Sequence, residues 1–257
     1  MSKIYALVTG ASSGIGYEYA VALARRHYSL VMVSNEEAIH EKAETIRREF
    51  PEVEVLSLVQ DLGIQDAAKK LYDWCRERNL EVEVLVNNAG VYHDRDFLDD
   101  SPAFNQLIMN LHMLTPAMLA YYFGGDMKAR RRGYVLNMSS VTSDYGIQRM
   151  STYAPTKAFL RYFSCSLHIE LRQHGIIVTC VRPGAVATPL YSISERAMRL
   201  GLAVGAIIRP QALAEKGIKA MFKGKHEITP GFFTRILGIV PCIPIGVLRL
   251  IRRRGWF

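Results

Sequence analysis

The sequence predicts an α/β fold: a doubly wound parallel sheet with helices on both faces. Two observations lead to this prediction. Short, almost wholly apolar runs alternate with longer amphipathic stretches, which is the pattern of parallel strands buried by helices. A glycine-rich turn also follows the first apolar run and opens the first amphipathic stretch. With 257 residues, 49% of them hydrophobic and 22% charged, the chain is long enough to bury one large core.

Strands and helices can be assigned from this alternation. Strands are expected over 4–9, 30–34, 53–59, 82–87, 134–139 and 176–182. Helices are expected over 14–27, 36–50, 65–79, 102–131, 152–174 and 210–222. No linker or internal repeat interrupts the series, so we interpret residues 1–257 as one domain with an apolar C-terminal extension. Its ligand is expected at the carboxyl ends of the strands, where the strand order reverses.

Charge and cysteine usage narrow the function classes. The net charge is +8, but the basic residues are dispersed except for clusters at 128–132 and 252–254, and no nucleic-acid-binding motif lies beside either cluster. We therefore expect no nucleic-acid partner. The four cysteines are far apart in the sequence, which argues against a metal site or a disulfide framework and fits a reducing compartment. No signal peptide and no run of 18 uncharged apolar residues is found, so a cytoplasmic location is expected.

The glycine-rich turn reads Thr9-Gly10-Ala11-Ser12-Ser13-Gly14-Ile15-Gly16. Glycines let the backbone N–H groups approach a diphosphate closely, and the helix that begins there offers its positive N-terminal end to the anion. Glycine also serves ordinary turns, but this loop follows an apolar strand and opens a helix. The segment therefore predicts dinucleotide binding.

The spacing Gly-x-x-x-Gly-x-Gly behind Thr9 resembles the cofactor loop of the short-chain dehydrogenase/reductase family. Further matches follow in the expected order over residues 4–190, and they resemble motifs that the family carries after successive strands. They are Asp61-Leu62, Asn87-Asn88-Ala89-Gly90, Asn110, Asn137-Met138-Ser139-Ser140, Tyr153-x-x-x-Lys157 and Pro183-Gly184-Ala185-Val186-Ala187-Thr188. The resemblance implies a Rossmann-type fold and an oxidoreductase that transfers a hydride between a nicotinamide cofactor and a carbonyl/alcohol pair.

The resemblance and the loop chemistry together give a set of expected cofactor-binding residues. They are Gly10, Ser12, Ser13, Gly14, Ile15, Gly16, Ser34, Asn35, Asp61, Leu62, Asn88, Ala89, Gly90, Tyr153, Lys157, Pro183, Gly184, Val186 and Thr188. No metal ligand is expected.

The expected catalytic residues are Asn110, Ser140, Tyr153 and Lys157. Free tyrosine has a pKa of about 10, and a nearby ammonium favours the phenolate. Lys157 lies four residues after Tyr153 in a predicted helix, so the two side chains share a face. Of the two adjacent serines, Ser140 precedes Tyr153 by the thirteen residues that the resemblance implies, whereas Ser139 does not.

The resemblance gives Asn110 a structural and catalytic role, but the spacing around it differs. The interval from Asn110 to Ser140 is about two residues longer than the resemblance implies. This predicts an insertion around Tyr121–Arg132.

The end of the second strand bears on which nicotinamide cofactor binds. An acid that would bind the ribose 2′-OH of NAD(H) is missing from Val33-Ser34-Asn35, and the basic residues found in many NADP-dependent relatives are missing too. Glu36 and Glu37 are expected to begin the next helix, where acids suit its dipole. Because Ser12, Ser34 and Asn35 are small and polar, we expect NADP(H) to be favoured over NAD(H).

The remaining sequence concerns the substrate and partners. The resemblance implies a substrate lid over 189–225, and its apolar residues predict an apolar ketone or alcohol: steroid, fatty-acyl or aromatic. The apolar, basic tail over 230–257 predicts packing in a homo-oligomer, a dimer or tetramer, with peripheral membrane contact as the alternative. Two other functions remain open: an NAD-dependent hydroxysteroid or secondary-alcohol dehydrogenase, and a non-catalytic dinucleotide-binding regulator.

Overall fold

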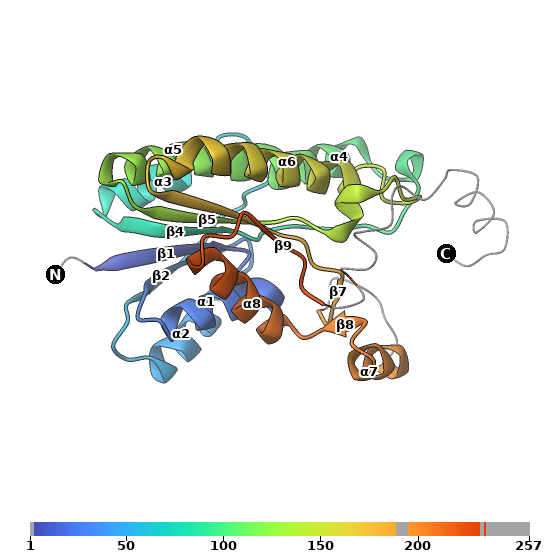
Figure 1. The fold of residues 1–257 in the computed structure, drawn as a ribbon, viewed down its shortest axis with the longest axis horizontal. Helices are drawn as coiled ribbons and strands as arrows, with labels where there is room; N and C mark the ends of the chain where they lie inside the picture. The colour runs from blue at the N-terminus through green and yellow to red at the C-terminus, as the bar shows by residue number, and fades with distance from the viewer. Residues whose placement is uncertain (1–2, 189–194, 232–233, 235–257) are drawn as a thin grey trace.

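A seven-stranded parallel sheet forms the centre of the computed structural model, which describes residues 3–188, 195–231 and 234. The strand order is β3-β2-β1-β4-β5-β6-β9 (Figure 1). The strands are β1 (Ile4–Thr9), β2 (Ser29–Ser34), β3 (Val55–Val59), β4 (Glu81–Asn87), β5 (Gly133–Met138), β6 (Ile176–Val181) and β9 (Glu227–Ile228). The order reverses between β1 and β4, so this sheet is doubly wound as predicted.

Helices cover both faces of the sheet (Figure 1). One layer contains α1 (Gly14–Ala24), α2 (Ile39–Glu49) and α8 (Pro210–Phe222). The other contains α3 (Ala67–Glu77), α4 (Pro102–Met109), α5 (Thr115–Arg130) and α6 (Tyr153–Arg172). Each layer packs its own apolar cluster onto the sheet, because a parallel strand alternates its buried side chains between two covered faces.

The predicted helix over 102–131 is interrupted. The structure has α4, a π-helical turn over Asn110–Leu114, and then α5. Pro116 has no N–H to donate to the carbonyl of His112, so the ordinary helical bond cannot form there. The predicted helix over 36–50 is also shorter: α2 begins at Ile39, which leaves Glu36 in a bend after β2. Strand β9 and the small pair β7 (Ala185–Val186) and β8 (Ile207–Ile208) are two residues each, too short to give a period in the sequence.

The segment expected to form the lid contains two different helices. Helix α7 (Glu195–Ala203) lies away from the sheet in Figure 1 and exposes Leu200. Helix α8 instead belongs to the core: a Cβ at Gly217 would lie 2.5 Å from the Tyr19 hydroxyl of α1, so the glycine permits this close contact. Residues 189–194 and nearly all of the predicted tail lie outside the described residues. Among the helices that the structure describes, none is long and apolar enough to cross a membrane.

We predict that Gly16→Ala destabilises the protein. A Cβ at this position would lie 2.0 Å from the carbonyl oxygen of Gly10, a backbone atom that cannot rotate away. Overpacking of this kind costs about 1–3 kcal/mol, and urea unfolding measures it. Gly125→Ala is the matched control on α5, because its Cβ would meet nothing within 4 Å. Since alanine is the better helix former, the control should gain up to about 1 kcal/mol. Equal stability of the two variants would contradict the close packing at Gly16.

Candidate active site

A cavity of about 500 Å³ lies where β1 to β6 end. Its walls contain residues at or just after the carboxyl end of each of these strands, because parallel strands bring all of those ends to one edge of the sheet. The expected site residues that line it are Gly10, Ser12, Ser13, Gly14, Ile15, Ser34, Asn35, Asp61, Leu62, Asn88, Ala89, Gly90, Ser140, Tyr153, Lys157, Pro183, Gly184, Val186 and Thr188. Residues from six separate segments therefore meet in one hollow.

The glycine loop and the loop after β4 are joined by hydrogen bonds at one end of this cavity. The Thr9 hydroxyl accepts from the amides of Asn88 and Ala89, at 3.0 Å each, and the Asn88 side chain donates back to the carbonyls of Thr9 and Gly10. Gly10 has a φ of +65°, and a Cβ there would lie 2.8 Å from the Cα of Ala89. Only glycine allows the two loops to come this close.

The N-terminus of α1 faces the same end of the cavity. Ser13 precedes the helix but makes no side-chain cap bond, which leaves first-turn N–H groups for another acceptor. Gly14 and Ile15 of this turn line the cavity. Backbone donors at a helix N-terminus bind phosphate groups, so the residues present fit the diphosphate of a dinucleotide.

Ser140, Tyr153 and Lys157 line the cavity together. Ser140 follows β5, whereas Tyr153 is the first residue of α6 and Lys157 lies one turn later. The Lys157 ammonium is 5.5 Å from the centre of the Tyr153 ring and donates to the carbonyl of Met138 at 2.9 Å. Its burial lowers the pKa of Lys157 to about 8, because the charged form is penalised away from water. Pro155 fits this helix as its third residue, where first-turn N–H groups have no helical partner in any case.

The two adjacent serines have different partners. Ser139 donates its hydroxyl proton to the backbone carbonyl of Lys157 at 2.6 Å, which ties the end of β5 to α6. Ser140 accepts from the amide of Thr142 at 3.2 Å, and an accepting hydroxyl keeps its own proton to donate. The arrangement favours Ser140 as the group that meets a ligand oxygen in the cavity.

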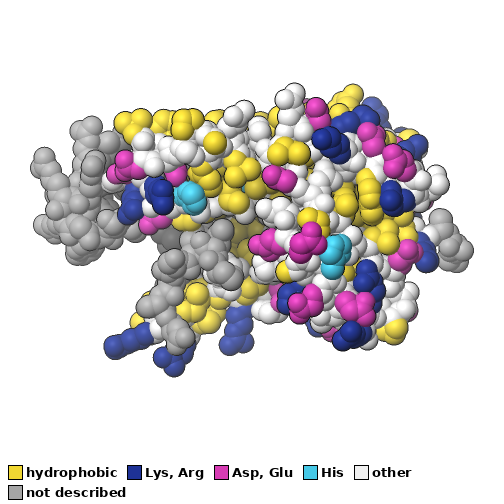
Figure 2. All heavy atoms as spheres, turned by 180° about the vertical axis from the view of Figure 1, so that it is seen from behind, with side chains coloured by type: hydrophobic (Ala, Val, Ile, Leu, Met, Phe, Trp, Pro, Cys, Tyr) yellow, Lys and Arg dark blue, Asp and Glu magenta, His cyan; other side chains and the backbone are white. Residues whose placement is uncertain are grey.

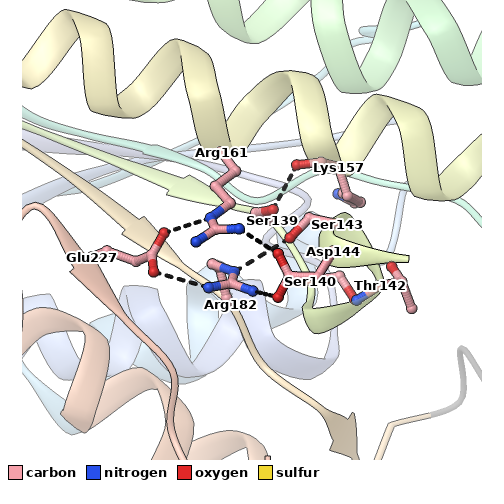
Figure 3. Close-up of polar contacts among 9 residues, drawn as sticks. All are labelled: Ser139, Ser140, Thr142, Ser143, Asp144, Lys157, Arg161, Arg182 and Glu227. Atoms are coloured by element: carbon pink, nitrogen blue, oxygen red, sulfur yellow. Dashed lines mark hydrogen bonds and ion pairs between the residues drawn. The ribbon is translucent and has the colours of Figure 1, made fainter. Parts of the chain in front are cut away.

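A partly buried ionic network supports the turn that follows Ser140 (Figure 3). The Asp144 carboxylate pairs with both Arg161 of α6 and Arg182 after β6. Each arginine also bonds Glu227 of β9 at 2.9 Å. Burial alone would raise the pKa of Glu227, but the hydrogen bonds from the arginines lower it below its ordinary value. Because the Arg182 side chain is only 4% exposed, water screens the two pairs that Arg182 makes only a little.

Comparison with known proteins gives the family. A family model described as short chain dehydrogenase matches residues 4–198. The chain belongs to the short-chain dehydrogenase family. A very-long-chain 3-oxoacyl-CoA reductase of Anas platyrhynchos is 34% identical over 200 residues, which are 74% of this chain and 62% of that protein. The chain thus spans less than two thirds of the length of this relative. The enzyme of the same name from Macaca fascicularis is 29% identical over 91% of this chain and 72% of its own length.

Solved structures of other dehydrogenases share this fold. One from Sphingobium yanoikuyae, in complex with NADPH, superposes with a TM-score of 0.78 and is 27% identical over 90% of this chain and 88% of its own. A bulky-bulky ketone specific alcohol dehydrogenase from Comamonas testosteroni also gives a TM-score of 0.78, at 25% identity over 99% of this chain and 92% of its own. The predicted family and fold class are therefore confirmed.

Two expected site residues do not line the cavity of this short-chain dehydrogenase. Gly16 lies underneath the glycine loop, where it permits close packing. Asn110 donates its side-chain amide to the carbonyl of Gly63 at 3.0 Å. The structure therefore does not bring the Asn110 side chain together with Ser140, Tyr153 and Lys157. Its place at the start of the π turn directs it toward the loop after β3.

The structure also adds residues that the sequence reasoning missed. They are Glu36, Gln60, Val91, Leu107, Leu111, His112, Met138 and Ser139. Most are apolar or lie beside an expected residue, and a two-residue window around each motif would have found several. Glu36 was expected in the next helix, but the later start of α2 leaves it in the cavity wall. His112 lies two residues after the expected Asn110, and the long interval from Asn110 to Ser140 is the sequence signal that could have found it.

We predict that the buried ammonium of Lys157 makes stability depend on pH. A free lysine has a pKa of 10.5, so between pH 8 and 10.5 the unfolded chain holds a proton that the folded chain has released. The free energy of unfolding should therefore rise with pH over this interval. Lys157→Met keeps the length of the side chain and removes this contribution.

Urea unfolding without cofactor, from pH 7.5 to 10.5, measures the effect. The free energy of unfolding of the wild type minus that of Lys157→Met should rise by about 3 kcal/mol over this range, at ~1.4 kcal/mol per pH unit. Lys216→Met, on the exposed side of α8, is the control and should show no such trend. A difference between wild type and Lys157→Met that does not change with pH would contradict a buried Lys157 with a lowered pKa.

Proposed function

We propose that this protein is an NADP(H)-dependent reductase of an apolar ketone. One observation carries the proposal: Ser140, Tyr153 and Lys157 line the same cavity as the glycine loop and the N-terminus of α1. Anion-binding donors and proton-transfer groups thus stand in a single hollow. A nicotinamide dinucleotide long enough to reach from one to the other would supply the hydride.

Ser140, Tyr153 and Lys157 each have a different role in the proton transfer. Ser140 donates its hydroxyl to the carbonyl oxygen of the substrate, and Tyr153 gives its phenolic proton to the same oxygen as the alcohol forms. The ammonium of Lys157 stabilises the phenolate that remains, from a buried position where its field is little screened. In the reverse direction the phenolate takes the proton back.

Three features support an apolar substrate. Leu107, Leu111 and Met138 add apolar surface to the cavity. The expected lid carries further apolar residues, although 189–194 lie outside the described residues. The relatives named above are called 3-oxoacyl-CoA reductases, and a solved neighbour is called specific for bulky ketones. We therefore rank a fatty-acyl ketone first among the steroid, fatty-acyl and aromatic classes.

The cofactor preference rests on the end of β2. The Ser34 hydroxyl donates to that of Ser12 at 3.0 Å, so two small polar groups and Asn35 stand where the acid of an NAD-binding protein would be. Glu36, which lines the cavity, favours the alternative of an NAD-dependent hydroxysteroid or secondary-alcohol dehydrogenase. The second alternative, a non-catalytic regulator, has no need of Ser140, Tyr153 and Lys157 in one place.

A homo-oligomer remains part of the proposal. Hydrophobic side chains lie along the upper edge in Figure 2, where Figure 1 places α4, α5 and α6. The exposed apolar residues of these helices and the π turn are Met109, Leu114, Tyr121, Tyr162 and Ile169. An apolar face of this kind favours contact with a second copy. The tail contact, with a subunit or with a membrane, concerns residues outside the described part of the chain.

We predict that Tyr153→Phe lowers turnover steeply and spares cofactor binding. The variant keeps the ring against His112 and removes only the hydroxyl that gives the proton. Loss of a positioned general acid costs about 10²- to 10⁴-fold in rate. NAD(P)H absorbance with a panel of ketones measures turnover, and cofactor fluorescence measures binding. Tyr162→Phe, on an exposed tyrosine of the same helix, should behave as wild type. Turnover by Tyr153→Phe close to that of wild type would overturn the proposed function.

We also predict tighter binding of NADPH than of NADH. Asn35→Asp should weaken NADPH binding by about tenfold or more, because a carboxylate repels the 2′-phosphate, and should leave NADH binding unchanged or improved. Glu36→Gln removes an acid that is already in the wall and should strengthen NADPH binding only. Fluorescence titration at constant salt measures all three proteins. Tighter NADH binding by the wild type would favour the NAD-dependent alternative.

A further inference from the structure

His112 is a buried polar residue in the cavity wall that the proposed chemistry does not yet use. It lies within the π turn over Asn110–Leu114, is 1% exposed and lines the cavity. It also stands close to the loop after β4: a Cβ on Gly90 would lie 2.8 Å from its Nε2 atom. A buried imidazole in such a position needs a hydrogen-bond partner at each ring nitrogen.

The partners of His112 determine its tautomer. The amide of Val91 can only donate, and its nitrogen lies 3.0 Å from Nε2, so Nε2 accepts and carries no proton. The proton of the neutral ring is therefore on Nδ1, which lies 3.1 Å from the Thr156 hydroxyl oxygen. Thr156 accepts this bond and donates its own proton to the backbone carbonyl of Tyr153 at 2.7 Å. In this series of hydrogen bonds, each donor has one acceptor.

This chain of bonds ends at the residue proposed to transfer the proton. It runs from the amide of Val91, through the imidazole and the Thr156 hydroxyl, to the first turn of α6. The ring of His112 also meets the Tyr153 ring edge-on, with 5.6 Å between the centroids. The loop after β4 and the phenol of Tyr153 are thus held in one geometry by a single imidazole.

The surroundings keep His112 neutral. Burial lowers its pKa well below 6.5, and the positive charge of Lys157 lowers it further. A protonated ring would place a second N–H against the donor of Val91, which breaks the chain of bonds. With His112 neutral, Lys157 is the cation that lies over the Tyr153 ring among the described residues.

The position of His112 also accounts for the spacing anomaly at Asn110. The interval from Asn110 to Ser140 is about two residues too long for the resemblance, and His112 lies two residues after Asn110. Helix α5 runs without interruption from Thr115 to Arg130, through most of the stretch where the insertion was expected, and ends at Arg131 in a left-handed conformation. If His112 takes the place of the family asparagine, no insertion is needed.

We propose that His112 is a positioning residue of this active site, which in its neutral Nδ1–H form joins the loop after β4 to α6 and so sets the place of the Tyr153 phenol. The inference rests on the reductase function proposed above. It assigns to His112 the structural part of the role for which Asn110 was expected.

Kinetics of matched variants test the proposal. His112→Phe keeps a ring against Tyr153 but removes both ring nitrogens, and kcat should fall about 10- to 100-fold, because small displacements of a reacting group are costly. NADPH affinity should stay within about threefold of wild type, since the dinucleotide donors are elsewhere, and the pH profile of kcat should shift. Asn110→Ala is the comparison and should lose less of kcat. His226→Phe, at an exposed histidine that does not line the cavity, is the control, and its kcat should stay within about threefold. A larger loss in Asn110→Ala than in His112→Phe would overturn the assignment.

Variants of Thr156 separate positioning from mere packing. Thr156→Val has the same shape and lacks the hydroxyl, so it should lose part of kcat, whereas Thr156→Ser should restore it. His112 and Thr156 act through the same series of hydrogen bonds. The fold-loss of kcat in the double variant His112→Phe/Thr156→Val should therefore be clearly less than the product of the two single losses. Independent, multiplicative losses would contradict the chain.

A measurement without turnover distinguishes this inference from the proposed function. In ¹⁵N-histidine NMR of the whole protein, the signals of His112 are those absent from His112→Phe. They should show the Nδ1–H tautomer and no protonation between about pH 8 and 5.5. An Nε2–H tautomer or protonation in this range would overturn the inference. A wild type that reduces no ketone, with the expected tautomer, would reject the proposed function and leave the bonding of His112 in place.

Discussion

The close contact between the glycine loop and the loop after β4 is the constraint on which the rest of the site depends. β1 and β4 are neighbours at the reversal of strand order, so their carboxyl ends emerge side by side. The Thr9 hydroxyl and the Asn88 side chain join the two loops, and Gly10 and Gly16 remove the Cβ atoms that would separate them. With this contact in place, the N-terminus of α1 points into the cavity and the backbone after Asn88 is set for His112.

A second set of buried polar contacts carries this geometry across the sheet to α6. Asn87 at the end of β4 donates to the Asn137 side chain of β5 at 2.8 Å, and Asn137 donates to Ser164 of α6 at the same distance. Ser139 and Lys157 add two further bonds between the end of β5 and α6. A buried polar group without a partner costs about 1–3 kcal/mol, so these hydrogen bonds favour one position of α6 on the sheet. The position of α6 in turn determines where Tyr153, its first residue, lies.

The charges of the site are arranged so that the buried cation near Tyr153 has no carboxylate partner among the described residues. Lys157 donates to a neutral carbonyl, which is why its burial lowers its pKa. The arginines beside the turn after Ser140 are different, because each pairs with Asp144 and Glu227. Buried ion pairs add little net stability when compared with apolar packing, but removal of one partner is costly. The network therefore holds the turn that carries Ser140, while Lys157 remains available to the phenol.

The sequence by itself determined the fold class, the family and most of the cavity wall. Alternation of apolar runs and amphipathic stretches follows from burying a parallel sheet on both faces, and motifs such as Tyr153-x-x-x-Lys157 depend only on local spacing. The tertiary structure decided what depends on contacts between distant segments. The π turn before Pro116 turns Asn110 toward Gly63 and brings His112 to Val91 and Thr156, residues 21 and 44 positions away in the chain. The start of α2 at Ile39 likewise leaves Glu36 in the cavity wall. No hydrophobic period and no sequence motif indicates either result. Each depends on where a helical turn places a side chain against a residue that is distant in the sequence.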